Sequence, residues 1–287
     1  MSIASGESAV AELAVCGWDE VFILRLEGPT DSIGRVVWSW NAADEQDLPD
    51  TMKTRFGSTD DCKPVDGGRA ILVTSSGDGV ALVERATKKV LFWASAVNAH
   101  SADLLPGGLV AVAASHDPDR PGDRLVLFAP GTPGREIAHY ELPSGHGVVW
   151  DSRRELLYAL GYDLVRVFRL SGGLTGEGAL EEVSRIELPA TGGHELYPVP
   201  GTPYLSVSTS RQCWLLDRDT ETVVPHPVLA DHAGVKSIGV NPRSGQLAWT
   251  EAEGSHWWAT RIRMLDPPNL VRMPDRRLYK VRWLEQE

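Results

Sequence analysis

A four-strand pattern that recurs about every 40 residues is the feature that most restricts how this chain can fold. Each repeat opens with a short segment, passes through a turn and continues with three further strand-like runs separated by turns. The repeats begin at Asp60, His100, His146, His194 and Lys236. Four short strands per repeat at this spacing are typical of the blades of a β-propeller.

The two ends of the chain supply a sixth unit. Residues 14–26 predict two strands about a turn at residues 17–20, and residues 35–40 predict a third, but no opening segment precedes them. Residues 278–284 predict one strand with no partner after it. Pairing that strand with the first three closes a ring and removes two sheet edges. We therefore predict an all-β, six-bladed β-propeller with one blade shared between the N- and C-terminal strands; a β-sandwich is the alternative.

Composition agrees with many short strands in one large domain. The 287 residues include 28 glycines, 19 prolines and 10 tryptophans, and 42% are hydrophobic. We expect residues 1–11 to form a flexible tail and residues 12–287 to form a single propeller domain. Residues 41–58 are polar without a clear period, so they predict a long loop.

Charge and targeting signals restrict the partners. A net charge of -11 without a basic run argues against nucleic acid, and no apolar run approaches the roughly 18 residues of a membrane span. The N-terminus lacks the features of a signal peptide, although a longer secreted precursor is left open.

The three cysteines, Cys16, Cys62 and Cys213, are odd in number and lack metal-motif spacing, which favours a reducing compartment. A Cys16–Cys62 disulfide stays possible. We expect a cytoplasmic monomer.

Three histidines occupy one register of the repeat. His100, His146 and His194 each open a unit, and the first strand of a propeller blade lines the central channel, so the three side chains should converge at one channel mouth. Neutral imidazoles that face one cavity suit a divalent metal, manganese or zinc better than calcium. The alternative for each histidine is a hydrogen-bonded turn residue. Candidate carboxylates to complete or orient the metal shell are Asp60, Asp61, Asp103 and Glu195.

The rest of the predicted ring is basic. Lys236 opens the next unit, Lys280 and Arg282 lie on the last strand, and Lys63 falls level with Asp103. Such cations would attract a small anion such as a carboxylate, although side-chain alternation lets at most half of residues 279–283 face the channel. Tyr279 is a candidate proton donor or base.

The chain resembles a bacterial and fungal family of propeller-like domains of unknown function at residues 14–17, 98–108, 146–151, 192–196 and 235–237. The architecture and the histidine cluster show a looser resemblance to oligogalacturonate lyases and other propeller polysaccharide lyases. That resemblance implies a divalent metal, held mainly by histidines at His100, His146 and His194, that binds the uronate carboxylate while a basic side chain removes the proton at C5. The chain departs from the lyase pattern because it lacks an identifiable amide ligand and has six blades where that group has more.

The leading functional hypothesis is therefore a metal-assisted lyase that acts on a small uronate-containing oligosaccharide. Its candidate catalytic residues are His100, His146, His194, Lys236, Tyr279, Lys280 and Arg282. The first alternative is metal-dependent hydrolysis of a lactone or glycoside, and the second is a propeller without enzymatic activity that binds a sugar or a protein. Fold analogy alone does not choose among them.

Overall fold

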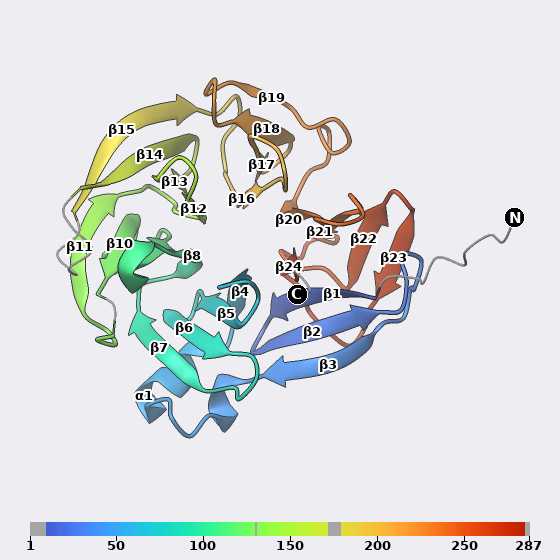
Figure 1. Ribbon diagram of the computed structural model, residues 1–287, viewed down its shortest axis with the longest axis horizontal. Helices are drawn as coiled ribbons and strands as arrows, with labels where there is room; N and C mark the ends of the chain where they lie inside the picture. The colour runs from blue at the N-terminus through green and yellow to red at the C-terminus, as the bar shows by residue number, and fades with distance from the viewer. Residues whose placement is uncertain (1–9, 130, 172–178, 285–287) are drawn as a thin grey trace, which may run out of the picture.

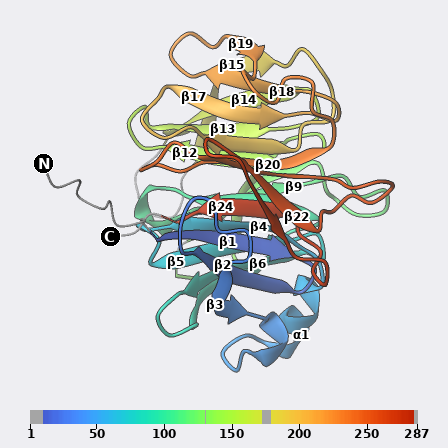
Figure 2. The ribbon, with the colours of Figure 1, turned by 90° about the vertical axis from the view of Figure 1, so that its right-hand side faces the viewer.

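The computed structural model describes residues 10–129, 131–171 and 179–284, and these residues form six four-stranded antiparallel sheets. Figure 1 looks along the central channel and shows the sheets arranged around it like the blades of a propeller. Figure 2 shows the same ring from the side. The six-bladed β-propeller predicted from the sequence is confirmed.

One blade joins the two ends of the chain, as predicted. Blade I contains, from the channel outward, β24 (Lys280–Trp283), β1 (Ala11–Gly17), β2 (Glu20–Leu26) and β3 (Arg35–Trp40). β24 and β1 pair antiparallel with Ala14 opposite Arg282. The ring is thus closed by backbone hydrogen bonds between the last and the first described strands, so β1 is paired on both sides.

The other five blades follow in chain order, and each begins at the channel and moves outward. Blade II is β4 (Thr59–Val65), β5 (Ala70–Ser75), β6 (Gly79–Glu84) and β7 (Val90–Ser95). Blade III is β8 (Ala99–Leu104), β9 (Val110–Ala114), β10 (Arg124–Phe128) and β11 (Glu136–Glu141). Blade IV is β12 (Gly147–Asp151), β13 (Leu156–Leu160), β14 (Leu164–Ser171) and β15 (Ala179–Glu187). Blade V is β16 (Glu195–Pro198), β17 (Tyr204–Ser208), β18 (Cys213–Asp217) and β19 (Val223–Pro225). Blade VI is β20 (Val235–Val240), β21 (Leu247–Glu251), β22 (Arg261–Leu265) and β23 (Asn269–Arg272).

Helical structure is confined to short segments. The long loop expected at residues 41–58 instead contains η1 (Ala42–Asp44), α1 (Asp50–Lys53) and η2 (Thr54–Phe56), and a further turn, η3 (Pro106–Gly108), follows β8. The side chain of Asn41 accepts a hydrogen bond from the backbone N–H of Ala43 and so caps η1. None of the described helices is long and apolar enough to cross a membrane.

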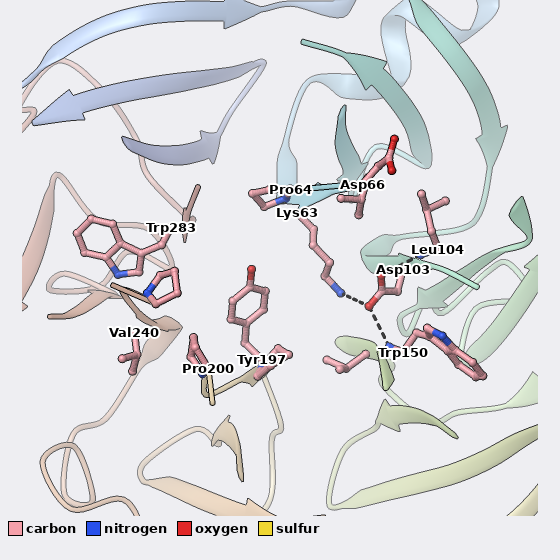
Figure 3. A pocket seen from close by; sticks show the side chains of 14 residues that line it. Lys63, Pro64, Asp66, Asp103, Leu104, Trp150, Tyr197, Pro200, Val240 and Trp283 are labelled. Carbon is pink, nitrogen blue, oxygen red and sulfur yellow. Dashed lines mark hydrogen bonds and ion pairs between the residues drawn. The ribbon is translucent and has the colours of Figure 1, made fainter. Parts of the chain in front are cut away.

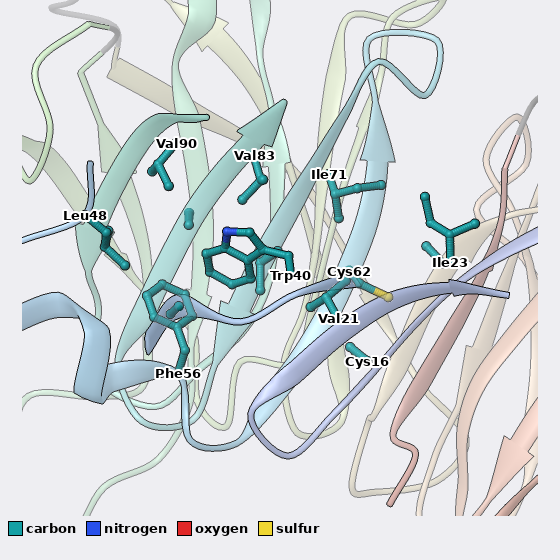
Figure 4. Close-up of a cluster of buried hydrophobic side chains, with 14 of the residues drawn as sticks. Cys16, Val21, Ile23, Trp40, Leu48, Phe56, Cys62, Ile71, Val83 and Val90 are labelled. Carbon is teal, nitrogen blue, oxygen red and sulfur yellow. The ribbon is translucent and has the colours of Figure 1, made fainter. Parts of the chain in front are cut away.

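Apolar side chains are packed between neighbouring blades. The cluster between blades I and II includes Trp40 and Phe56, whose rings meet edge to face with centroids 5.3 Å apart. Cys16 and Cys62 lie in the same cluster and, like Cys213, are buried free thiols (Figure 4). The helical segment after β3 therefore contributes Phe56 to the core, which explains why this polar stretch does not remain an irregular loop.

The channel itself contains a buried layer of charge. Arg282, with 0% of its surface exposed, donates from Nε and Nη2 to the two carboxylate oxygens of Asp61 at 3.0 and 3.2 Å. Lys280 lies 4.0 Å from Asp61 and 3.7 Å from Glu195, and Nη1 of Arg282 lies 3.0 Å from Glu195. Burial alone would raise the pKa of Asp61, but attraction by Arg282 and Lys280 outweighs it and lowers that pKa. We call these four side chains the charged layer.

Removing one member of the charged layer should destabilise the protein strongly. We expect Arg282→Met to lower the free energy of unfolding by about 3–5 kcal/mol, because it leaves buried carboxylates without their cation. Urea denaturation measures the change. The matched control is Arg185→Gln, which removes an exposed guanidinium paired with Glu182 and should lower the free energy of unfolding much less, because exposed ion pairs contribute little. A loss for Arg282→Met that is no larger than the control would contradict this account of the layer.

Candidate functional site

A ring of six polar side chains surrounds one end of the channel, just before or at the start of each innermost strand. Its members are Asp60, His100, His146, His194, Lys236 and Tyr279, one from each blade. The imidazole centroids of His100 and His146 are 4.2 Å apart, and those of His146 and His194 are 4.9 Å apart. The structure therefore brings the three predicted histidines together, and we call the six side chains the polar ring.

The ring continues on both sides of the histidines. Nε2 of His100 lies 3.7 Å from Oδ1 of Asp60, and the ring centroids of His100 and Tyr279 are 6.5 Å apart. The ammonium of Lys236 lies 6.0 Å from the centre of the Tyr279 ring. Tyr279 thus takes the sixth position, which the sequence had marked only as a candidate proton donor.

A repeated local turn orients the three imidazoles. Nδ1 of His100, His146 and His194 lies 2.9, 2.8 and 2.7 Å from the carbonyl oxygen two residues earlier. Because a carbonyl oxygen only accepts, each Nδ1 carries a proton, and in a neutral ring Nε2 then keeps its lone pair. The residues that supply these carbonyls, Asn98, Ser144 and Gly192, all have left-handed φ angles of 49°, 49° and 76°.

The same turn precedes Lys236, where Gly234 has a φ of 70°. In addition, the pairing register shifts around Asp60, His100 and Lys236, which marks β-bulges at these three ring positions. A bulge changes the direction of a side chain without ending the strand. The sequence analysis missed this signal, although Asn, Ser and Gly two residues before a repeat start are residues that suit a left-handed turn.

Burial keeps His146 and His194 neutral. Burial, followed by repulsion from His100 and His194, holds the pKa of His146 well below its usual value. Burial and the nearby Lys236 lower the pKa of His194 to about 3. Both side chains are therefore uncharged at neutral pH and present Nε2 as a hydrogen-bond acceptor or a ligand atom.

Lys236 and Tyr279 are the proton-carrying groups of the ring. Lys236 is only 8% exposed, and it forms no ion pair or hydrogen bond with any residue that the structure describes. Burial, followed by repulsion from Lys280, lowers its pKa to about 8. Burial and the nearby Asp60 raise the pKa of Tyr279, so its hydroxyl stays protonated. A base and an acid therefore lie side by side.

The expected group of four cations at one mouth does not form. Of the predicted set only Lys236 belongs to the polar ring. Lys280 and Arg282 project into the channel below it, where they are neutralised by Asp61 and Glu195 because buried charges need partners. Lys63 lies toward the other end of the channel and pairs with Asp103 at 3.2 Å. Asp103 and Glu195 therefore do not lie beside the imidazoles as carboxylate ligands.

The metal prediction does not gain support from the geometry. The free Nε2 atoms are the kind of donor that zinc or manganese accepts. However, in residues 10–129, 131–171 and 179–284 no group of three or more His, Cys, Asp or Glu side chains is arranged to hold a metal ion. The residues described do not form a ready-made metal site. Metal binding therefore stays a prediction.

A cavity of about 360 Å³ opens at the opposite end of the channel (Figure 3). Trp283, Tyr197 and Trp150 line it, with Pro64 and Pro200 at its edge, and Lys63 and Asp103 at its floor. Oδ2 of Asp103 also accepts the backbone N–H of Trp150 at 2.9 Å. The charged layer separates this cavity from the polar ring, so the two ends of the channel are different environments.

Comparisons with known proteins place the chain in a family without assigning an activity. Residues 29–287 match the family of unknown function DUF6528, and no curated protein matches. A functionally unknown protein from Desulfotomaculum acetoxidans DSM 771 is 11% identical, with a TM-score of 0.58 over 89% of this chain and 75% of its own. A "putative 6-phosphogluconolactonase" from Bacteroides fragilis NCTC 9343 is 10% identical, with a TM-score of 0.56 over 98% and 99%. Hydrazine synthase from Kuenenia stuttgartiensis is 15% identical, with a TM-score of 0.47; the match covers 69% of this chain and 60% of that one. These similarities show the fold alone.

The tautomers of the ring histidines can be measured directly. At pH 5.5 we expect long-range ¹H–¹⁵N spectra to show His146 and His194 neutral with the proton on Nδ1, because burial holds the pKa of His146 well below its usual value and lowers that of His194 to about 3. The control is exposed His116, whose pKa is raised by its hydrogen bond to Asp123 and which should be protonated.

The lowered pKa of His194 also determines in which direction the stability of the protein changes with pH. Unfolded histidine titrates near pH 6.5, so the contribution of His194 is complete above that pH and declines as the pH falls toward 3. A His194→Gln variant should therefore lose less stability than the wild type between pH 7 and pH 4. Protonated ring histidines at pH 5.5, or an equal loss in both proteins, would contradict the assignment.

Proposed function

We propose that this chain, which belongs to the DUF6528 family, is a carbohydrate-active enzyme that cleaves a small uronate-containing oligosaccharide by β-elimination at the polar ring. The observation that carries the proposal is the buried, unpaired Lys236 with a pKa of about 8 beside the protonated Tyr279. A base of this strength is partly neutral at physiological pH, which suits proton abstraction.

The reaction needs one base and one acid. In the proposed step, the neutral amine of Lys236 takes the proton from C5 of the uronate, the C5–H electron pair forms the C4=C5 double bond, and the C4–O4 bond breaks. The leaving oxygen receives the proton of the Tyr279 hydroxyl. Lys236 then returns its proton to the solvent and Tyr279 regains one, so the enzyme is restored without an external oxidant or reductant.

The remaining ring members bind and orient the substrate. Nε2 of neutral His146 and His194 accepts hydrogen bonds from sugar hydroxyl groups, and His100 beside Asp60 lies next to them in the same ring. Nζ of Lys280 donates to the backbone carbonyl of His194 at 3.3 Å, and the positive charge of Lys280 beside the ring favours the substrate carboxylate. Asp61 and Glu195 hold Lys280 in place. Arg282 then acts as a positioning residue and does not reach the substrate.

Replacing the base should remove activity. We expect Lys236→Met to lower kcat about 100-fold or more, the range of a general base. In the wild type kcat should rise with pH through about 8, because the neutral amine is the active form. The assay follows the absorbance of the new double bond with oligomers of galacturonate, glucuronate, mannuronate and guluronate. The control is Lys89→Met, an exposed lysine in the turn before β7, which should keep full activity.

Absence of an unsaturated product from every uronate would overturn the proposal. A product that has gained water would instead identify hydrolysis of a glycoside or lactone. Ligand binding without any product would identify a sugar-binding propeller without enzymatic activity.

Elemental analysis checks the metal prediction separately. If the imidazoles hold an ion, the purified wild-type protein should contain about one equivalent of zinc or manganese, and the His100→Ala/His194→Ala variant should contain none. Circular dichroism confirms that the variant is folded. If neither protein contains metal, the metal prediction is wrong and elimination proceeds with Lys236 and Tyr279 alone. If both contain metal, the ion is bound away from His100 and His194.

A further inference from the structure

Three tryptophans and an arginine extend from the polar ring across the rim of the channel. Trp18 lies in the turn between β1 and β2, Trp257 and Trp258 in the loop after β21, and Arg277 two residues before Tyr279. The rings of Trp18 and Trp257 stack with centroids 5.6 Å apart and planes 11° from parallel. Trp257 meets Tyr279 edge to face at 5.5 Å. We call these four side chains the rim cluster.

Two aromatic members of the rim cluster, Trp18 and Trp257, are exposed. Trp18 is 36% exposed and Trp257 is 42% exposed, so both rings keep apolar surface open to a ligand. Trp18 also has a left-handed φ of 56°, a conformation that is strained for a bulky side chain. Its carbonyl accepts a hydrogen bond from the backbone N–H of Thr59 at 2.5 Å, which holds the turn against blade II. Strained, exposed aromatic residues beside a candidate site indicate a binding role.

Arg277 supplies an oriented cation. Its guanidinium carbon lies 3.9 Å from the ring centre of Trp18 and 5.1 Å from that of Trp258. The side chain is exposed and forms no ion pair or hydrogen bond within the described part of the chain. A guanidinium held against aromatic rings keeps N–H donors available, and these match a carboxylate in a bidentate geometry.

Acidic side chains lie near Arg277, so an anion can bind at this part of the rim only if the arginine offsets their charge. A cavity of about 220 Å³ lies against Trp18 and Arg277 and is also bordered by Asp19 and Asp275. Glu20 at the same cavity is paired with Arg276. Without the charge of Arg277 the two aspartates would repel an anion from this part of the rim.

We infer that the rim cluster is a second binding position, which takes the neighbouring acidic sugar of the same oligosaccharide. Trp257 packs against the sugar ring, and Arg277 binds its carboxylate. The inference rests on the proposed function, because it extends the substrate outward from the polar ring. It names the substrate class more narrowly: a uronate oligomer with acid groups on adjacent sugars, and not a single uronate linked to neutral sugars.

Calorimetric binding of galacturonate and digalacturonate tests the inference. The titrations are done at pH 5.5, where protonated Lys236 does not act as a base and turnover is suppressed. We expect the wild type to bind digalacturonate at least tenfold more tightly than galacturonate. Arg277→Gln and Trp257→Ala should remove most of that preference and leave the galacturonate affinity unchanged. The matched control is Arg272→Gln, an exposed arginine at the end of β23, which should change neither affinity.

The outcomes separate the inference from the proposed function. An unchanged digalacturonate affinity in Arg277→Gln, or an equal loss for both ligands, overturns the inference and makes the rim cluster a structural contact. Arg277-dependent preference for digalacturonate without any unsaturated product at pH 8 supports the second position and overturns the lyase proposal. Binding of neither ligand by the wild type overturns both.

Discussion

The ion pairs of Asp61 with Arg282 and Lys280 are the interaction on which the rest of the architecture depends. Arg282 and Lys280 lie on the last strand of the chain, whereas Asp61 lies on the first strand of blade II. The strand that joins the two chain ends therefore reaches its neighbour through buried charge as well as through backbone pairing. Glu195 of blade V contacts the same two cations, so one layer connects three blades across the channel. Such a layer is costly to disrupt because its members have no access to water.

The charged layer also divides the channel by chemistry. On one side the inner strands begin, and bulges or left-handed turns bring neutral imidazoles, one lysine and one tyrosine together. On the other side the same strands end in prolines and aromatic residues around a cavity. The layer as a whole is balanced between two cations and two carboxylates, but Lys280 lies close enough to the polar ring to affect the pKa of His146 and Lys236. The low pKa of His194 and the pKa of about 8 at Lys236 reflect burial first and then a nearby cation, which is Lys236 for His194 and Lys280 of the charged layer for Lys236.

Periodicity was sufficient to predict the blades, the closure by the last strand and the convergence of the histidines, because each depends on register alone. Which groups the channel-facing side chains contact could not be predicted from register. The sequence placed Lys280 and Arg282 on a strand that faces the channel, and the structure agrees, but whether they face a ligand or a buried carboxylate depends on depth along the channel. Trp18 was also missed as a site residue. An exposed tryptophan in a turn, where small or polar residues are usual, was the available signal.

The closing strand makes the site and the stability of the propeller interdependent. The segment that leads into β24 carries Arg277 of the rim cluster and Tyr279 of the polar ring, and β24 itself carries Arg282 of the charged layer. The backbone N–H of Tyr279 donates to the carbonyl of Cys16 on β1 at 2.8 Å, which fixes the ring position of the tyrosine to the N-terminal half of blade I. Release of this strand would therefore remove the proposed acid, the proposed second binding position and the buried cations in one step. Variants that loosen blade I should reduce ligand binding and global stability together, whereas changes at Lys236 or Arg277 act on the ligand alone.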